Sequence, residues 1–128
     1  MSSKQLGIFG EQIAESYLKN KGYQILGENY SFRVPGNPQK GEIDIIVKKN
    51  DIISFIEVKT LRDSDSLIRP EEKVNFGKQR KLVKTAESWL MKKKIPLNSK
   101  WQIDVIAIEL NLNKKAKINH FKNAISYH

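Results

Sequence analysis

The chain has 128 residues, no cysteine and a formal net charge of +9, from 23 lysines and arginines against 14 acidic residues. This length is typical of one domain, expected over residues 1–128, and the basic excess favours nucleic acid as a partner before an anionic membrane surface. The lack of cysteine excludes disulfides and thiolate metal sites. No apolar run approaches the ~20 residues of a membrane span. A cytoplasmic location with no membrane contact is therefore expected.

Helical periodicity begins near the start of the chain. Over residues 6–21 apolar side chains recur every three or four positions and Gly22 follows as a stop, which predicts an amphipathic helix. Its apolar stripe would be centred near Ile13 and Tyr17, with Glu11 at the border. An acid at this position is typical of a solvated helix flank, and a place in a functional site is the alternative.

A strand and a basic loop are predicted next. Residues 23–30 favour a first strand, whereas residues 31–40 contain two prolines and a glycine and predict an irregular loop. Arg33 and Lys40 lie in this loop, where they could reach a substrate. An ordinary solvated connection would have the same composition.

The most informative stretch is a predicted β-hairpin over residues 41–60. Two β-branched apolar runs flank a short polar break, a pattern typical of antiparallel strands joined by a tight turn. With residues 50–51 as a two-residue loop, counting back along both strands places Asp44 directly opposite Glu57. The same count places Glu42 opposite Lys59.

This register would bring three carboxylates and one ammonium group together at one end of the hairpin. Cross-strand Cβ atoms are about 5 Å apart, so like charges facing each other repel and half-buried carboxylates lose hydration. A divalent cation removes the conflict, because carboxylates and a backbone carbonyl are the ligands that a hard ion such as Mg²⁺ takes. The pattern therefore indicates a metal site.

A second helix is predicted over residues 71–94. Its apolar stripe comprises Phe76, Leu82, Val83, Ala86, Trp89 and Leu90. The basic residues mostly off this stripe are Lys78, Arg80, Lys81 and Lys84. They form either a solvated face or a surface that contacts phosphates. Gln79 falls on the stripe, where an amide is either a satisfied, half-buried hydrogen-bonding group or a group directed at a site.

Alternation over residues 101–110 predicts a third long strand, and residues 111–117 predict a polar turn before a short edge strand over residues 118–127. His120 and His128 have no carboxylate or second histidine at ligand spacing, so both are expected at the surface. Glu-x-Lys at residues 57–59 is a weak motif by itself, because residues 71–73 also match it at a predicted helix start. The facing Asp44 makes the first match informative.

Several further motifs accompany this Asp and Glu-x-Lys pair. They are Gly10-Glu11-x-x-Ala14-x-x-Tyr17-Leu18, Asn29-Tyr30, Gly41-Glu42-Ile43-Asp44-Ile45-Ile46, Phe55-Ile56-Glu57-Val58-Lys59-Thr60, Lys78-Gln79-Arg80-Lys81 and Asp104-Val105. Together they resemble the YraN family of the restriction-endonuclease-like (PD-(D/E)XK) nucleases, which is similar to Holliday-junction resolvases. Ile43 stands where the superfamily signature has proline.

The resemblance implies an α/β fold with a restriction-endonuclease-like core, in which helices flank a mixed central sheet that contains a central hairpin. It implies Asp44, Glu57 and the carbonyl of Val58 as metal ligands and Lys59 as the catalytic lysine. Glu11 would be a supplementary acid of the site, and Gln79 matches the family's helix glutamine.

These residues predict a metal-dependent phosphodiesterase that acts on DNA with Mg²⁺ or Mn²⁺. Backbone contacts from the basic helix and loop would give little base specificity, which makes branched or otherwise structured DNA the expected substrate. A nucleic-acid-binding module without catalysis and a small basic adaptor protein are the alternatives. The sequence leaves the oligomeric state open, a homodimer included.

Overall fold

The computed structural model describes residues 1–33, 35–62, 76–111, 113 and 115–125. The elements formed by these residues are α1 (Ser3–Asn20), β1 (Gln24–Arg33), β2 (Lys40–Lys49), β3 (Ile52–Arg62), α2 (Phe76–Lys92), β4 (Trp101–Leu110) and β5 (Ala116–Phe121). The predicted α/β class is confirmed, with a mixed sheet flanked by two helices, as in the restriction-endonuclease-like fold. Neither described helix is both long enough and apolar enough to cross a membrane.

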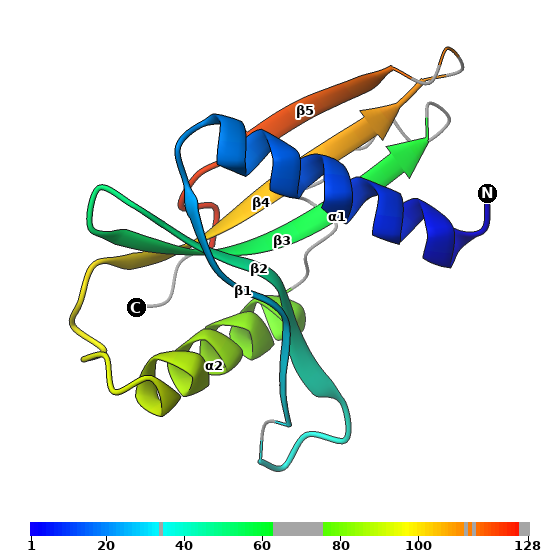
Figure 1. The fold of residues 1–128 in the computed structure, drawn as a ribbon. Coiled ribbons are helices and arrows are strands. Elements are labelled where there is room, and N and C mark those ends of the chain that lie inside the picture. Colours follow the sequence, from blue (N-terminus) through cyan, green and yellow to red (C-terminus); the bar gives the residue numbers. More distant parts are fainter. Residues whose placement is uncertain (34, 63–75, 112, 114, 126–128) are drawn as a thin grey trace.

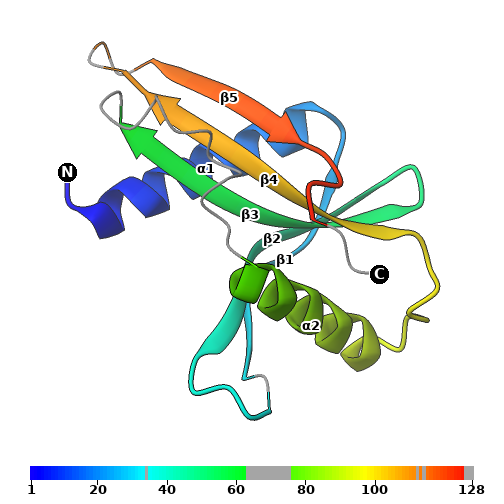
Figure 2. The same ribbon diagram turned by 180° about the vertical axis from the view of Figure 1, so that it is seen from behind.

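The sheet has the strand order β1-β2-β3-β4-β5 (Figure 1). All neighbouring strands are antiparallel except β3 and β4, which are parallel. A parallel pair needs a crossover connection, and the segment between these two strands contains α2. The two helices cover opposite faces of the sheet: α1 lies in front of it in Figure 1, and α2 lies in front of it when the molecule is turned around in Figure 2.

The first helix begins three residues earlier than its apolar periodicity predicts. Ser2 caps it, because its hydroxyl accepts from the Gln5 N–H while the Gln5 side chain accepts from the Ser2 N–H. The buried residues of α1 are Leu6, Gly10, Ala14 and Leu18. The buried stripe is therefore rotated away from the predicted centre, and Ile13 and Tyr17 are only half-buried.

The predicted loop over residues 31–40 is wrong at both ends. β1 continues to Arg33, and Arg33 pairs with Lys40 at the start of β2. Cross-strand pairing thus extends both strands into the segment whose prolines and glycine suggested a loop. The described residues outside the strands, 35–39, form the tip of a β1–β2 arm that extends below the sheet in Figure 1.

The turn of the central hairpin is as predicted. Lys49 pairs with Ile52, and the two loop residues Asn50 and Asp51 have φ angles of 52° and 65°. Both angles lie in the left-handed region that a two-residue hairpin loop of type I′ requires, and Asn and Asp tolerate it well.

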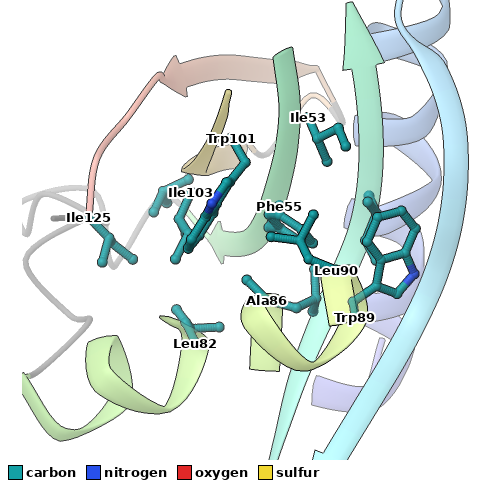
Figure 3. Packing of buried hydrophobic residues seen from close by; sticks show 12 residues of the cluster. Ile53, Phe55, Leu82, Ala86, Trp89, Leu90, Trp101, Ile103 and Ile125 are labelled. Atoms are coloured by element: carbon teal, nitrogen blue, oxygen red, sulfur yellow. The ribbon is translucent and has the colours of Figure 1, made fainter. Parts of the chain in front are cut away.

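Two hydrophobic clusters fix the helices on the sheet. On the α2 face, Phe55 lies between Trp89 and Trp101, with ring centroids 5.7 Å from each, and Leu82, Ala86 and Leu90 complete the contact (Figure 3). On the α1 face, the buried members are Ala14, Leu18, Ile45, Val47, Ile56, Ile106 and Ile108.

The remaining boundaries agree in part with the sequence analysis. β4 has the predicted bounds, whereas β5 starts two residues before the predicted edge strand and ends at Phe121. The described part of α2 starts at Phe76, so the predicted helix start and the second Glu-x-Lys at residues 71–73 lie outside the described residues. His128 also lies outside them.

Candidate active site

The central hairpin opens into a fork. β2 and β3 pair from Lys49 and Ile52 up to Ile45 and Ile56, and beyond that pair β2 stays with β1 while β3 stays with β4. Figure 1 shows the two strands diverging from this point, with β2 towards the bottom of the view and β3 up and to the right.

Asp44 lies where the fork opens. The ladder ends one pair before the predicted Asp44–Glu57 pair, and Oδ2 of Asp44 instead accepts a hydrogen bond from the Val58 N–H at 2.7 Å. Ile43 packs in the α2 cluster and Ile45 in the α1 cluster, although residues two apart in a regular strand share a face. The side-chain alternation of β2 is therefore interrupted at Asp44.

The predicted pairing of Glu42 with Lys59 is wrong. Glu42 pairs with Ser31 of β1, and its carboxylate is exposed and 3.5 Å from Nζ of Lys40. β1 thus holds this part of β2 away from β3. Two hairpin carboxylates, Asp44 and Glu57, remain at the fork itself.

The environment of Asp44 raises its pKa from 3.8 to about 7. Burial is the largest cause and the nearby Glu57 charge adds to it, whereas the Val58 hydrogen bond opposes both. Glu57 is in a different environment, because its Oε1 lies 3.2 Å from Nζ of Lys59 and 3.0 Å from Nζ of Lys78. Burial lowers the pKa of Lys59.

Glu11 reaches the same region from α1. Gly10 lies directly against the hydroxyl of Thr60 in β3, where any Cβ would collide, and this close approach brings the next residue towards the fork. Burial raises the pKa of Glu11, as do the charges of Glu42 and Glu57. The structure therefore places Glu11 near the two hairpin acids.

A cleft of about 560 Å³ opens over the fork on the α2 side. Its lining residues are Asn37, Gln39, Lys40, Gly41, Glu42, Asp44, Glu57, Lys78, Lys81 and Leu82. Gly41 has no room for a Cβ because Thr85 of α2 lies against it, so the helix rests directly on β2. Three lysines therefore surround a floor that contains the two fork acids.

Asp44 also lines a second cleft, of about 290 Å³, on the α1 side. Glu11, Glu15 and Glu28 line this cleft, and no lysine or arginine among the described residues does. The fork is consequently open to a basic cleft on one side and to an acidic cleft on the other.

The other predicted nucleic-acid-binding residues, Arg33, Arg80 and Lys84, are not among the residues that line the cleft. Arg33 belongs to the β1–β2 arm and donates to the Pro38 carbonyl, whereas Lys84 lies 3.8 Å from Glu87 and does not line the cleft. Arg80 is exposed on α2, and Gln79 is half-buried in the first described turn of that helix. Their predicted roles stay predictions.

The donor set at the fork fits a hard divalent ion. The N–H and C=O of one residue in a β-strand point to the same side of that strand, so the Val58 carbonyl faces the same side as the N–H that binds Asp44. Among the described residues no three acidic or histidine side chains form a cluster that could hold an ion by themselves. Two carboxylates and a carbonyl with water as the remaining ligands suit Mg²⁺, which usually keeps several waters.

Sequence reasoning missed two contacts. Lys78 was expected on a basic helix face that is either solvated or in contact with phosphates, yet it reaches Glu57. The surface position expected for His120 is wrong: its side chain is 5% exposed, its Nε2 lies 2.8 Å from Oδ2 of Asp104, and its Nδ1 bonds the Tyr17 hydroxyl at 3.0 Å. Asp104 is fully buried at the centre of β4, and a charged residue within an apolar strand is the signal that predicts such a partner.

The sequence matches the model of a family described as "Uncharacterised protein family UPF0102" over residues 10–108. A UPF0102 protein of Alkaliphilus oremlandii (strain OhILAs) is 44% identical over 124 residues, which cover 95% of this chain and 98% of that relative. A UPF0102 protein of Clostridium tetani (strain Massachusetts / E88) is 48% identical over 109 residues, which cover 85% and 83%. The residues matched by the family model include Glu11, both strands of the fork (β2 and β3) and α2.

Proposed function

The chain belongs to the UPF0102 family, also called the YraN family, and from this membership and the geometry of its cleft we propose that it is a metal-dependent phosphodiesterase acting on DNA. The observation that carries the proposal is the fork, where two carboxylates line a cleft that three lysines also line, and where one of these carboxylates bonds the backbone of Val58. A fold built for stability alone gains nothing from an acid whose pKa is raised by burial and by a second acid.

Asp44, Glu57 and the Val58 carbonyl would hold Mg²⁺ or Mn²⁺. The bound ion supplies a Lewis acid that makes a water molecule more acidic and offsets negative charge on a phosphate oxygen. Glu11, with its raised pKa, would add a further carboxyl group at the edge of this set. Gln79, one residue beyond Lys78, is proposed to support the site from α2.

Lys59 is proposed to act on the reacting groups. It lies 3.2 Å from Glu57, so its ammonium group would be beside any phosphate held at the two acids. In this position Lys59 would orient the attacking water or neutralise charge that develops on the phosphate. Burial lowers its pKa, so it would exchange a proton more readily than an exposed lysine.

Lys40, Lys78 and Lys81 would contact the DNA backbone. These lysines line the cleft, and Arg33 and Arg80 lie on the arm and the helix that border it. Phosphate contacts position DNA without reading its sequence, so substrate choice would depend on DNA shape. Branched or otherwise structured DNA is the substrate class that we propose.

A cleavage assay tests this function. Linear, single-stranded, flapped and four-way DNA are incubated with Mg²⁺, Mn²⁺ or EDTA, and cleavage is expected only with a metal ion. Glu57→Gln should abolish cleavage, and Lys59→Met should lower single-turnover cleavage about 100-fold or more at saturating metal. Glu87→Gln, which changes an acid of α2 that pairs with Lys84 outside the cleft, is the matched control and should cleave normally.

Two other outcomes identify the alternatives. Salt-sensitive DNA binding without metal-dependent cleavage of any substrate would indicate a non-catalytic nucleic-acid-binding module. No DNA binding at low salt would instead indicate a basic adaptor protein. Wild-type cleavage by Lys59→Met with metal binding intact would remove the catalytic assignment of that lysine alone.

A further inference from the structure

Oε1 of Glu57 holds two ammonium groups that come from different elements. Lys59 is its neighbour on β3, two residues along the same strand, with Nζ at 3.2 Å. Lys78 belongs to the first described turn of α2 and reaches the same oxygen at 3.0 Å. The glutamate side chain is 10% exposed, so the acceptor of both ion pairs lies largely out of bulk water.

This arrangement conflicts with the role of Glu57 as a metal ligand. A divalent ion binds a carboxylate oxygen at about 2.0–2.1 Å, and it would then lie within a few ångströms of both ammonium groups, where like charges repel. An ion on Oε1 would compete directly with both ammonium groups, and an ion on Oε2 would still be repelled by them, so ion binding is favoured when at least one ammonium group moves away.

Lys78 is the group that can leave more easily. The Lys59 side chain is 23% exposed and is fixed beside Glu57 by its position on the same strand, whereas the Lys78 side chain is 38% exposed. Lys78 also lines the cleft together with Lys40 and Lys81, so its head group can turn towards the cleft without unfolding any element.

On the basis of the proposed function, we propose that Lys78 occupies the ligand oxygen of Glu57 in the metal-free protein and turns to a DNA phosphate when the ion binds. Lys78 is thus a positioning residue with two alternative partners. Ion binding would release a cation into the cleft, and a phosphate in the cleft would draw that cation away from Glu57. Because coupling between two binding sites is reciprocal, metal and DNA would each strengthen the binding of the other.

A purely structural ion pair would behave differently. Removing a structural Lys78 would lower stability and leave metal affinity unchanged or weaker, since Glu57 would lose order. Removing a competitor frees the ligand oxygen and tightens metal binding. Metal affinity measured without DNA therefore separates the two roles and does not depend on catalysis.

The first experiment is calorimetric titration of Mn²⁺ into the full chain. Lys78→Met keeps the apolar stem and should bind Mn²⁺ about threefold to tenfold more tightly than wild type, the scale of a partly exposed ion pair. Lys81→Met is the matched control, because it removes the same charge from the same cleft but its Nζ donates to Oε1 of Gln39 at 3.0 Å. Its affinity should change less than twofold. Lys78→Gln, which keeps a polar head group, should increase Mn²⁺ affinity by the same factor. It replaces Lys78→Met in this test if that variant does not fold.

The second experiment measures affinity for a fluorescent DNA duplex with and without Ca²⁺ in place of the catalytic ion. Ca²⁺ should increase wild-type affinity more than it increases the affinity of Lys78→Met, whereas Lys81→Met should keep the wild-type ratio. Equal Mn²⁺ affinities of wild type and both Lys78 variants would overturn the inference and leave the proposed function standing. Absence of Mn²⁺ binding by wild type would overturn both. Tightened Mn²⁺ binding and coupled DNA binding without cleavage of any DNA would overturn the proposed catalysis alone.

Discussion

The two acids of the fork are chemically unequal although they are near neighbours. Among the described residues Glu57 has two ammonium partners, whereas Asp44 accepts from one backbone N–H and is largely removed from water. Burial and the nearby Glu57 charge raise the pKa of Asp44 to about 7, whereas the charge of Glu57 is compensated by the two lysines. Binding an ion requires that Asp44 release its proton.

The raised pKa of Asp44 predicts a pH-dependent cost in the metal-free protein. The folded chain keeps a proton on Asp44 that the unfolded chain loses near its ordinary pKa of 3.8, so the Asp44 contribution to stability falls as pH rises from about 4 to about 7. Asp44→Asn removes this dependence and can still accept from Val58. The variant should gain about 2–4 kcal/mol relative to wild type between pH 4 and pH 8, at about 1.4 kcal/mol for each unit of pKa difference.

Urea unfolding in EDTA across this pH range measures the effect. Asp51→Asn is the control, because Asp51 is exposed in the hairpin turn and asparagine tolerates its positive φ angle. Parallel stability curves for wild type and Asp44→Asn would show that Asp44 is ionised throughout and would contradict the prediction.

At the scale of elements, the two helices bring functional residues to the sheet through glycines. Gly10 lets α1 rest against Thr60 of β3 and carries Glu11 towards the fork, and Gly41 lets α2 rest on β2 through Thr85. The helix contacts thus serve packing and site geometry together.

Gly10→Ala is expected to lower stability, because its Cβ would collide with the Thr60 side chain and push α1 off the sheet. The expected loss is about 1–3 kcal/mol, as for other overpacked contacts. Gly7→Ala is a matched control in the same helix, since a Cβ at Gly7 meets nothing within 4 Å, and it should stabilise the protein by about 0.5–1 kcal/mol. Thermal and urea unfolding of both variants decide the matter; equal shifts would show that α1 does not depend on this contact.

Local sequence patterns predicted the bounds of the elements better than the contacts between elements. The Asn50–Asp51 turn and the bounds of β4 depend on residues close in sequence, and both are confirmed. The fork was missed because it depends on the pairing of β2 with β1, which extends past the end of the β2–β3 ladder. His120 was misplaced for the same reason, since one of its hydrogen-bond partners, Tyr17, is 103 residues away in the chain.

At the scale of the whole molecule, charge divides the two clefts that meet at Asp44. Lysines surround the cleft on the α2 side, whereas glutamates line the cleft on the α1 side. A phosphate backbone is attracted to the first and repelled by the second, so DNA is expected to lie across the α2 side and the β1–β2 arm.

Replacing Lys78, Lys81 and Lys84 together with alanine should flatten the salt dependence of DNA binding. Each neutralised phosphate contributes about −0.9 to the slope of log K against log salt for duplex DNA. Lys78 and Lys81 line the cleft and are expected to supply most of the change. The measurement is duplex affinity over a range of salt concentrations.

The control triple variant replaces Lys115, Lys117 and Lys122, which are exposed on and around β5 at the opposite edge of the sheet from β1. It lowers the net charge equally but should keep the wild-type slope. If the two triple variants gave the same slope, net charge rather than the cleft would determine DNA binding.

The fork also leaves an edge. Beyond Ile56 the described part of β3 has β4 as its single strand neighbour, and an unpaired strand edge can add a strand from another molecule. Glu57, Lys59 and Arg62 are charged residues of this edge strand, and charge on an edge strand opposes such pairing. Residues proposed for catalysis would therefore also reduce aggregation. A foreign strand that paired here would take the Val58 N–H from the Asp44 carboxylate, and edge-to-edge association and access of DNA to the site therefore exclude each other.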